Sequence, residues 1–258
     1  MNKQNDRILV FDSGLGGLSV LRELIRIMPG ERYLYLGDSR NAPYGTRPTD
    51  EVRNLTFRAI EEEMEQGVKA LVVACNTATT AAIEELRQRY PDKIVIGVEP
   101  ALKLAAERCP GGRIVVMATG VTLREPKFCA LMDRFSATSR IVPLPCPGLV
   151  EFVESGQLDT PELRAHLMEL LRPVLPGGID AIVLGCTHFP FLKPVIQSLV
   201  GGQAEILDGA HGTAQQTRRR LKAEGLIRMA QEGEVELRNS LGKAEILSLS
   251  AKLLEVRL

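Results

Sequence analysis

The sequence predicts an α/β fold of two pseudo-symmetric domains, each a mainly parallel sheet flanked by helices, with the functional site in the cleft between them. Short apolar, β-branched runs alternate with amphipathic helical patterns along the 258 residues, which is typical of parallel sheets covered by helices. Two such runs end in a cysteine, Cys75 and Cys186, and two others, at residues 7–14 and 113–120, also resemble each other. The offsets within these pairs, 111 and 106 residues, are similar and indicate an internal duplication.

The first half of the chain is expected to contain strands that are each followed by a helix. Asp12 and the glycines after it form the turn into the first helix, and the Pro- and Gly-rich segment at 39–48 is expected to be a loop. Thr49 begins the second helix, and Pro91 ends the third. The expected strands lie at residues 7–11, 33–37, 70–75 and 94–98, and the expected helices at 18–28, 49–67, 79–90 and 99–109.

The second half continues the same alternation and ends in a tail, residues 235–254, whose strand and helix are expected to pack onto the first domain. We expect a first domain of residues 1–98 plus 210–258, which carries Asp12 and Cys75. The second domain, residues 99–209, carries Cys186 and His188. Its expected strands lie at 113–118, 141–144, 181–186 and 205–207, and the expected helices of this half at 126–135, 149–154, 161–171, 191–200 and 213–224.

Charge and hydropathy exclude several classes of protein. Lysine plus arginine equals aspartate plus glutamate at 32 each, so no overall positive field attracts nucleic acid or a membrane surface. The arginine run at 218–220 is interpreted as a solvated helix face, because no aromatic residues interleave it. The chain has no apolar stretch long enough to span a bilayer, and its five cysteines lack the spacing of a disulfide framework. We expect a soluble cytoplasmic protein that binds neither nucleic acid nor a membrane.

The two strand-end cysteines are the first candidates for chemistry. Ligands of open α/β sheets bind at the carboxyl ends of the strands, and Cys75 and Cys186 are expected at that edge in the two halves. Each precedes a probable helix start, where backbone N–H groups favour a thiolate. Two thiols on opposite sides of one carbon can remove a proton from one face and return it to the other. That is the requirement of a racemase.

Polar residues beside these cysteines have both a structural and a functional interpretation. Asp12 and Ser13 suit a turn and helix cap, or alternatively a site where Asp12 assists a thiol and Ser13 holds a substrate. His188 is either a structural histidine or a group that tunes Cys186 or pairs with a substrate carboxylate. A Cys-x-His pair is too sparse for zinc, so no metal is expected. The glycine loop has Ser19 at the third fingerprint position, which argues against a dinucleotide.

Several longer motifs together resemble the glutamate racemases of the cofactor-independent aspartate/glutamate racemase family. They span nearly the whole chain in a fixed order, which makes the resemblance specific. They are D-S-G-L-G-G at Asp12, L-G-D-S with A-P-Y-G ending at Gly45, C-N-T-A at Cys75, C-P-G-L-V-E-F-V-E at Cys146, G-C-T-H-F-P at Gly185 and L-D-G-A at Leu207.

The resemblance implies interconversion of L- and D-glutamate without pyridoxal phosphate or another cofactor, in a homodimer that supplies D-glutamate for peptidoglycan. It implies that Cys75 and Cys186 are the acid/base thiols, assisted by Asp12, His188 and Glu154. The substrate-binding residues that it implies are Asp12, Ser13, Pro43, Tyr44, Gly45, Asn76, Thr77, Thr119, Thr122, Thr187 and His188.

The chain also departs from the family pattern. Glu125 and Phe128 stand in a loop that usually ends in serine and then tyrosine, Gly209 replaces a common serine, and Glu151 replaces a usual proline. These departures keep two alternatives open. One is a racemase for aspartate or another amino acid, and the other is a non-catalytic binding protein on the same fold.

Overall fold

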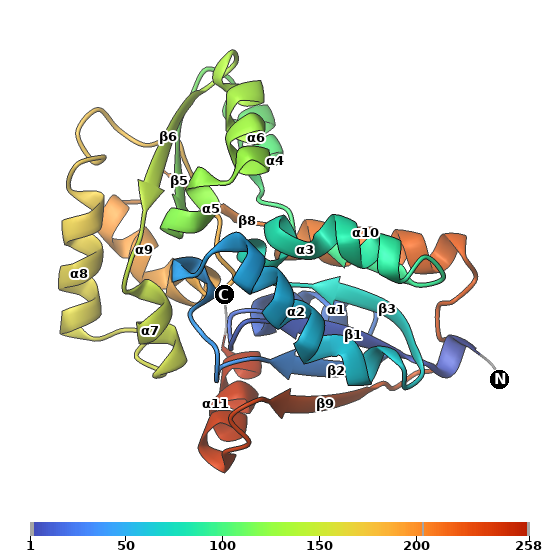
Figure 1. Ribbon diagram of the computed structural model, residues 1–258. Coiled ribbons are helices and arrows are strands. Elements are labelled where there is room, and N and C mark those ends of the chain that lie inside the picture. Colours follow the sequence, from blue (N-terminus) through green and yellow to red (C-terminus); the bar gives the residue numbers. More distant parts are fainter. Residues whose placement is uncertain (1–2, 203, 257–258) are drawn as a thin grey trace.

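The computed structural model describes residues 3–202 and 204–256 and shows two lobes, each a parallel sheet flanked by helices (Figure 1). We use "lobe" for one sheet and the helices packed on it. The first sheet has the strand order β4-β3-β1-β2-β9, with the bounds Ile94–Gly97, Val68–Val73, Arg7–Asp12, Arg32–Gly37 and Glu234–Asn239. The second has the order β6-β5-β7-β8, with the bounds Arg140–Pro145, Arg113–Ala118, Ala181–Leu184 and Glu205–Asp208.

The two sheets repeat one topology, which confirms the predicted pseudo-symmetry. Read in the opposite direction, the second sheet is β8-β7-β5-β6, and it matches the β4-β3-β1-β2 part of the first. Strand β7 therefore corresponds to β3, so Cys186 and Cys75 follow equivalent strands. Strand β9 has no counterpart among the described residues of the second sheet.

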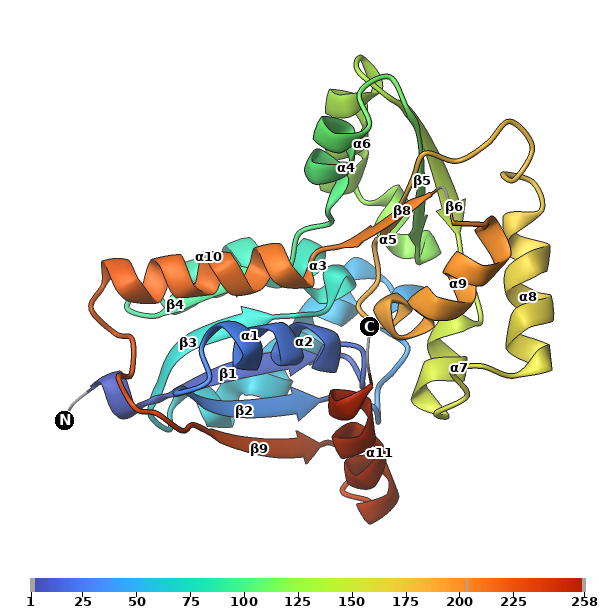
Figure 2. The ribbon, with the colours of Figure 1, turned by 180° about the vertical axis from the view of Figure 1, so that it is seen from behind.

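Helices cover both faces of the first sheet. Helix α2 lies in front of it in Figure 1, and α1 lies in front in the reverse view of Figure 2, where α10 packs along α1. Within the described residues, no helix combines the length and apolarity needed to cross a bilayer. The helical elements of the first lobe are η1 Lys3–Asn5, α1 Leu18–Ile27, η2 Tyr44–Thr46, α2 Thr49–Met64, α3 Asn76–Arg89, α10 Ala210–Ala223 and α11 Ala244–Glu255.

The second lobe contains two short helical elements that the sequence does not predict. A separate short helix, α5, precedes α6, and a 3-10 turn, η3, precedes α9 where one helix was expected. The bounds are α4 Leu102–Arg108, α5 Gly120–Arg124, α6 Pro126–Ser136, α7 Leu149–Glu154, α8 Pro161–Leu171, η3 Phe189–Leu192 and α9 Lys193–Val200.

Two helices of the first lobe begin earlier than predicted because of local caps. Helix α3 begins at Asn76 rather than 79, since the Cys75 side chain itself accepts a hydrogen bond from Ala78 N. Helix α10 begins at Ala210 rather than 213, since Asp208 accepts a bond from Ala210 N at 2.9 Å. The tail packs as predicted, with β9 paired to β2 and α11 against α1. The exact domain limits stay a prediction.

A buried ion pair joins segments at the amino-terminal edge of the first sheet. Lys69 lies in β3, whose other residues are apolar and buried, and its Nζ lies 2.6 Å from Glu31 Oε2. Both side chains are almost fully buried. Nζ also donates to the carbonyl of Leu226 at 2.9 Å, and Glu31 accepts from Arg228 N at 2.8 Å. The pair therefore ties the chain entering β9 to the core of the first lobe.

We predict that Lys69→Met lowers the free energy of unfolding by about 3–5 kcal/mol, because it leaves the Glu31 carboxylate buried without its cation. Urea unfolding measures the change. Lys103→Met is the control, since the Lys103–Glu107 pair is exposed and a change within about 0.5 kcal/mol is expected there. A Lys69→Met protein as stable as the wild type would show that the pair does not hold this edge together.

Candidate active site

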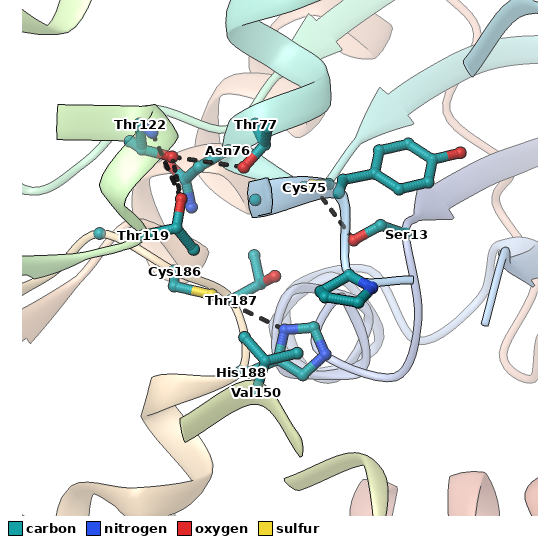
Figure 3. Close-up of a pocket in the computed structure, with 14 residues that line it drawn as sticks. Ser13, Cys75, Asn76, Thr77, Thr119, Thr122, Val150, Cys186, Thr187 and His188 are labelled. Carbon is teal, nitrogen blue, oxygen red and sulfur yellow. Dashed lines mark hydrogen bonds between the residues drawn. The ribbon is translucent and has the colours of Figure 1, made fainter. Parts of the chain in front are cut away.

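A pocket lies where the carboxyl ends of the strands in the two lobes face each other (Figure 3). Its cavity volume is ≈ 20 Å³, which is room for about one water molecule. The pocket is lined by Ser13, Pro43, Tyr44, Gly45, Cys75, Asn76, Thr77, Thr119, Thr122, Val150, Gly185, Cys186, Thr187 and His188. Both strand-end thiols thus reach one site.

Cys75 follows β3 and is 6% exposed. Its sulfur accepts hydrogen bonds from Ser13 Oγ and Ala78 N, both at 3.4 Å. Burial, followed by the charge of Asp12, raises the pKa of the Cys75 thiol to about 11, although these two hydrogen bonds lower it. The N–H contact expected from the helix start is present and lowers the pKa, but burial outweighs it and the net pKa is raised.

Cys186 follows β7, is 8% exposed, and faces an imidazole rather than the start of an α-helix. Its sulfur lies 3.7 Å from Nδ1 of His188, as the dashed line in Figure 3 shows. The next helical element is the 3-10 turn η3, for which His188 is the N-cap residue. The histidine, not a helix dipole, is thus the polar partner of this thiol.

His188 connects Cys186 to a carboxylate. Its Nε2 lies 2.6 Å from Glu154 Oε1, and the residue is 3% exposed. Burial alone lowers the pKa of His188, but hydrogen bonds and negative charge from Cys186 and Glu154 raise it well above its usual range. The histidine can therefore hold a positive charge between the two.

Glu154 ends α7 and reaches across to the first lobe. Its Oε1 accepts from Leu15 N at 2.6 Å, and its Oε2 accepts from Ser39 Oγ at 3.1 Å. Burial raises the pKa of Glu154, but the hydrogen bond to His188 and these further bonds lower it below its usual value. An ionised Glu154 therefore holds His188 in place and binds the two lobes together.

Asp12 lies behind the pocket wall. It is fully buried, accepts from Gly14 N at 2.9 Å, and accepts from Thr187 Oγ1 at 3.0 Å. Burial raises the pKa of Asp12, although the positive charge of His188 lowers it. Asp12 and Glu154 do not line the pocket, whereas the other predicted site residues do. Asp12 raises the pKa of the Cys75 thiol through its charge, and among the described residues no hydrogen bond between the two is recorded.

The predicted substrate-binding residues supply mostly uncharged polar groups. Thr77 and Thr122 come from opposite lobes, and their hydroxyls lie 3.3 Å apart. Asn76 Oδ1 is buried and has no hydrogen-bond partner among the described residues, so it is available to a ligand. The Tyr44 hydroxyl already donates to Asp38 at 2.7 Å. These groups suit a small, polar ligand that brings its own charges.

Sequence reasoning missed two lining residues, Val150 and Gly185. Each belongs to a quoted motif, but neither side chain has chemistry that would single it out. A Cβ at Gly185 would lie 3.0 Å from Ala118 Cβ, so a small residue is needed there. Among the described residues, no group of three or more His, Cys, Asp or Glu side chains is placed to hold a metal ion.

The departures from the family pattern lie outside the pocket lining. Phe128 is buried in the core of the second lobe, and Glu151 is exposed on α7. Glu125 accepts a hydrogen bond from Thr49 of the first lobe at 2.6 Å. A Cβ at Gly209 would lie 2.2 Å from the carbonyl oxygen of Glu99. The last two positions therefore affect how the lobes meet.

Comparison with known proteins agrees with the two-lobed fold. The glutamate racemase of Clostridium perfringens (strain SM101 / Type A) is 48% identical over 255 residues, which is 98% of each chain. The solved structure of glutamate racemase isoform RacE1 from Bacillus anthracis has a TM-score of 0.88 at 30% identity, covering 99% of this chain and 96% of that one. The structure of Escherichia coli glutamate racemase, solved with L-glutamate and the activator UDP-MurNAc-ala, has a TM-score of 0.86 at 29% identity. The match covers 97% of this chain and 94% of that one.

The family model described as Asp/Glu/Hydantoin racemase matches residues 8–217, which include both thiols, His188 and Glu154. The resemblance drawn from the sequence motifs is thereby confirmed, and the chain belongs to the Asp/Glu/hydantoin racemase family.

Proposed function

We propose that this protein is a glutamate racemase that works without a cofactor, with Cys75 and Cys186 as its two acid/base groups. The observation that carries the proposal is that thiols from equivalent strands of the two lobes line one pocket. A substrate α-carbon between them has one thiol on each face. The arrangement suits proton transfer, because a thiol that lies within reach of the reacting carbon can act as a general acid or, as thiolate, as a general base.

The proposed reaction conserves atoms and charge. One cysteine, as thiolate, takes the α-proton, and the electron pair of the broken C–H bond stays on the substrate as a carbanion. The other cysteine, as thiol, then gives its proton to the opposite face of that carbon. The product is the enantiomer, and the two cysteines have exchanged protonation states.

The two thiols have different surroundings, which suits this division of roles. Burial and Asp12 hold Cys75 in its neutral form, because they raise its pKa to about 11. Cys186 lies beside His188, whose raised pKa places positive charge near a developing thiolate. We infer that Asp12, His188 and Glu154 set these charges and do not themselves receive the α-proton.

Hydroxyls and amides of the pocket would hold the substrate. The start of α3, at Asn76 and Thr77, offers backbone N–H groups to a carboxylate, and Asn76 Oδ1 offers an acceptor to the ammonium group. Ser13 and Thr187, which also line the pocket, add hydroxyls from the first and the second lobe. The Escherichia coli relative, which is 29% identical, was solved with L-glutamate, and this supports the choice of glutamate.

The biological role forms part of the same proposal. A racemase of this kind would supply D-glutamate for peptidoglycan from the cytoplasm, and the resemblance to the family favours a homodimer. The family description also includes aspartate, so aspartate is the competing substrate.

We predict that Cys75→Ser and Cys186→Ser each lower the racemisation rate of glutamate by about 10²–10⁴-fold, because each removes one of two required proton-transfer groups. Proton NMR in D₂O follows loss of the α-proton signal from L- and D-glutamate in separate samples, and chiral analysis follows the opposite enantiomer. Cys109→Ser is the matched control, since Cys109 lies outside the pocket.

Full racemisation by either pocket variant would overturn the two-thiol mechanism. Exchange with aspartate but not with glutamate would keep the mechanism and replace the substrate. A wild-type protein that exchanges no amino acid would favour a binding protein on this fold.

We predict that the rate of Cys75 alkylation by iodoacetamide rises about tenfold per pH unit from about pH 7 to pH 10, since only the thiolate reacts. The reason is that burial and Asp12 raise the pKa of Cys75 to about 11, so the thiolate fraction keeps increasing over this range. Peptide mapping by mass spectrometry assigns the modified residue. A rate that levels off near pH 9, as for an ordinary thiol, would contradict the raised pKa.

A further inference from the structure

The lobes meet along a seam that forms one wall of the pocket. Figure 1 shows α5 of the second lobe next to the start of α2, and η2 and α5 are in contact. A Cβ at Gly45 would lie 2.8 Å from Thr119 Cβ, so the two chains pack closely there. The seam includes the hydroxyl pair of Thr77 and Thr122 and, farther out, the hydrogen bond from Thr49 to Glu125.

The pocket is closed with the seam in this position. Its cavity of ≈ 20 Å³ has room for about one water molecule, and any amino acid is several times larger. Cys75 and Cys186 are 6% and 8% exposed. A small molecule can therefore reach the thiols only after part of the wall moves.

The opposite wall is not suited to opening. There Glu154 accepts from Leu15 N, Thr187 donates to Asp12, and Ser19 donates to the Thr187 carbonyl at 2.9 Å. Most of these groups are buried. Separating them would leave buried polar atoms without hydrogen-bond partners, and each such atom costs free energy. The seam has fewer such bonds and lies beside an outer hollow of ≈ 310 Å³.

The chain also provides a hinge for such a motion. It passes between the lobes after β4 and again after β8, and these two crossovers touch at Glu99 and Gly209. A Cβ at Gly209 would lie 2.2 Å from the Glu99 carbonyl oxygen. Hinges of this kind consist of a few residues at element ends that absorb changes in backbone angles.

Among the seam contacts, the bond between Thr49 and Glu125 is the strongest candidate for holding the lobes closed. Its 2.6 Å length joins a hydroxyl donor to a carboxylate, and such bonds are stronger than neutral ones. The inner pair, Thr77 and Thr122, is neutral. The ion pair of Lys127 and Glu84 also crosses the lobes, but both side chains are more than half exposed, which leaves it weak.

The backbone of Glu125 is fixed in position. Its N–H donates to the carbonyl of Val121 at 3.1 Å, and its own carbonyl accepts from Phe128 N at 3.0 Å. Thr49 is the first residue of α2. Each partner is thus anchored to helices of its own lobe. Breaking the side-chain bond therefore removes a link between the two lobes and does not merely free a loop.

We propose that the Thr49–Glu125 hydrogen bond is a latch that holds the two lobes closed over the pocket and so limits access to Cys75 and Cys186. The latch is independent of what the thiols do, and it gives a role to a residue at which this chain departs from its family.

The test measures how fast iodoacetamide modifies Cys75 and Cys186 in the full-length protein, at one fixed pH, with peptide mapping by mass spectrometry. Thr49→Ala and Glu125→Ala are each expected to speed modification by about tenfold or more, the effect of losing a hydrogen bond to a charged group. Thr49→Ser keeps the hydroxyl and should behave as the wild type. Thr49→Ala changes no charge, so it separates opening from an electrostatic effect on the thiols.

The control is Asp50→Ala, which removes a carboxylate from the same turn of α2, where, within the described part of the chain, Asp50 pairs only with Arg53 of its own helix. The double variant Thr49→Ala/Glu125→Ala should open no more than either single variant, because both remove the same bond. Additive effects, rates equal to the wild type, or equal acceleration by Asp50→Ala would each overturn the latch. None of these readings requires racemase activity, so failure of the latch and failure of the proposed function remain distinguishable.

Discussion

The contact between His188 and Glu154 is the interaction on which the rest of the site depends. At 2.6 Å it aligns the imidazole with Cys186, and the same carboxylate oxygen accepts from Leu15 N across the lobes. It also explains the glycine-rich loop after β1. A Cβ at Gly14 would lie 2.0 Å from Glu154 Oε1, and one at Gly16 would lie 2.3 Å from His188 Nδ1. Gly14 and Gly16 are needed because side chains of the second lobe pack directly onto the backbone there, and Gly17 because Asp12 and Ala74 of the first lobe do so.

The pseudo-symmetry of the lobes fixes where the two thiols lie, and the residues that differ between the lobes give them different surroundings. Equivalent strands deliver Cys75 and Cys186 to facing edges, but the first lobe surrounds its thiol with Asp12 and the second with His188. A negative neighbour favours a thiol and a positive neighbour favours a thiolate. Asp12 therefore favours the neutral thiol of Cys75, while the imidazole of His188 lies where it can stabilise a thiolate that forms at Cys186. The internal repeat therefore places the two thiols opposite each other, and the residues that differ between the lobes give each thiol its own surroundings.

The sequence predicted the fold and most of the pocket, and the failures have physical causes. Buried parallel strands appear as continuous apolar runs, so their order and the repeat could be recognised. The start of α3 was misplaced because a cysteine acts as its cap, where serine, threonine or aspartate is usual. The net rise in the Cys75 pKa could not be predicted, because the helix start that lowers this pKa is visible in the sequence, whereas burial and the approach of Asp12 depend on tertiary structure. Val150 could not be recognised, since an aliphatic lining residue resembles any core residue.

The departures from the family pattern concern the joining of the lobes rather than the thiols. Glu125 bonds to Thr49 on the rim, and Gly209 lies against Glu99 where the chain crosses between the sheets. The common serine at position 209 would bring a Cβ to about 2.2 Å from a backbone oxygen, so the crossovers would have to move apart. With glycine they can stay in contact, which brings the lobes together at the crossovers while Glu125 joins them at the rim. Glu125 and Gly209 thus both influence how the two lobes are placed relative to each other, one at the rim and one at the crossovers. Neither changes the groups around Cys75 and Cys186.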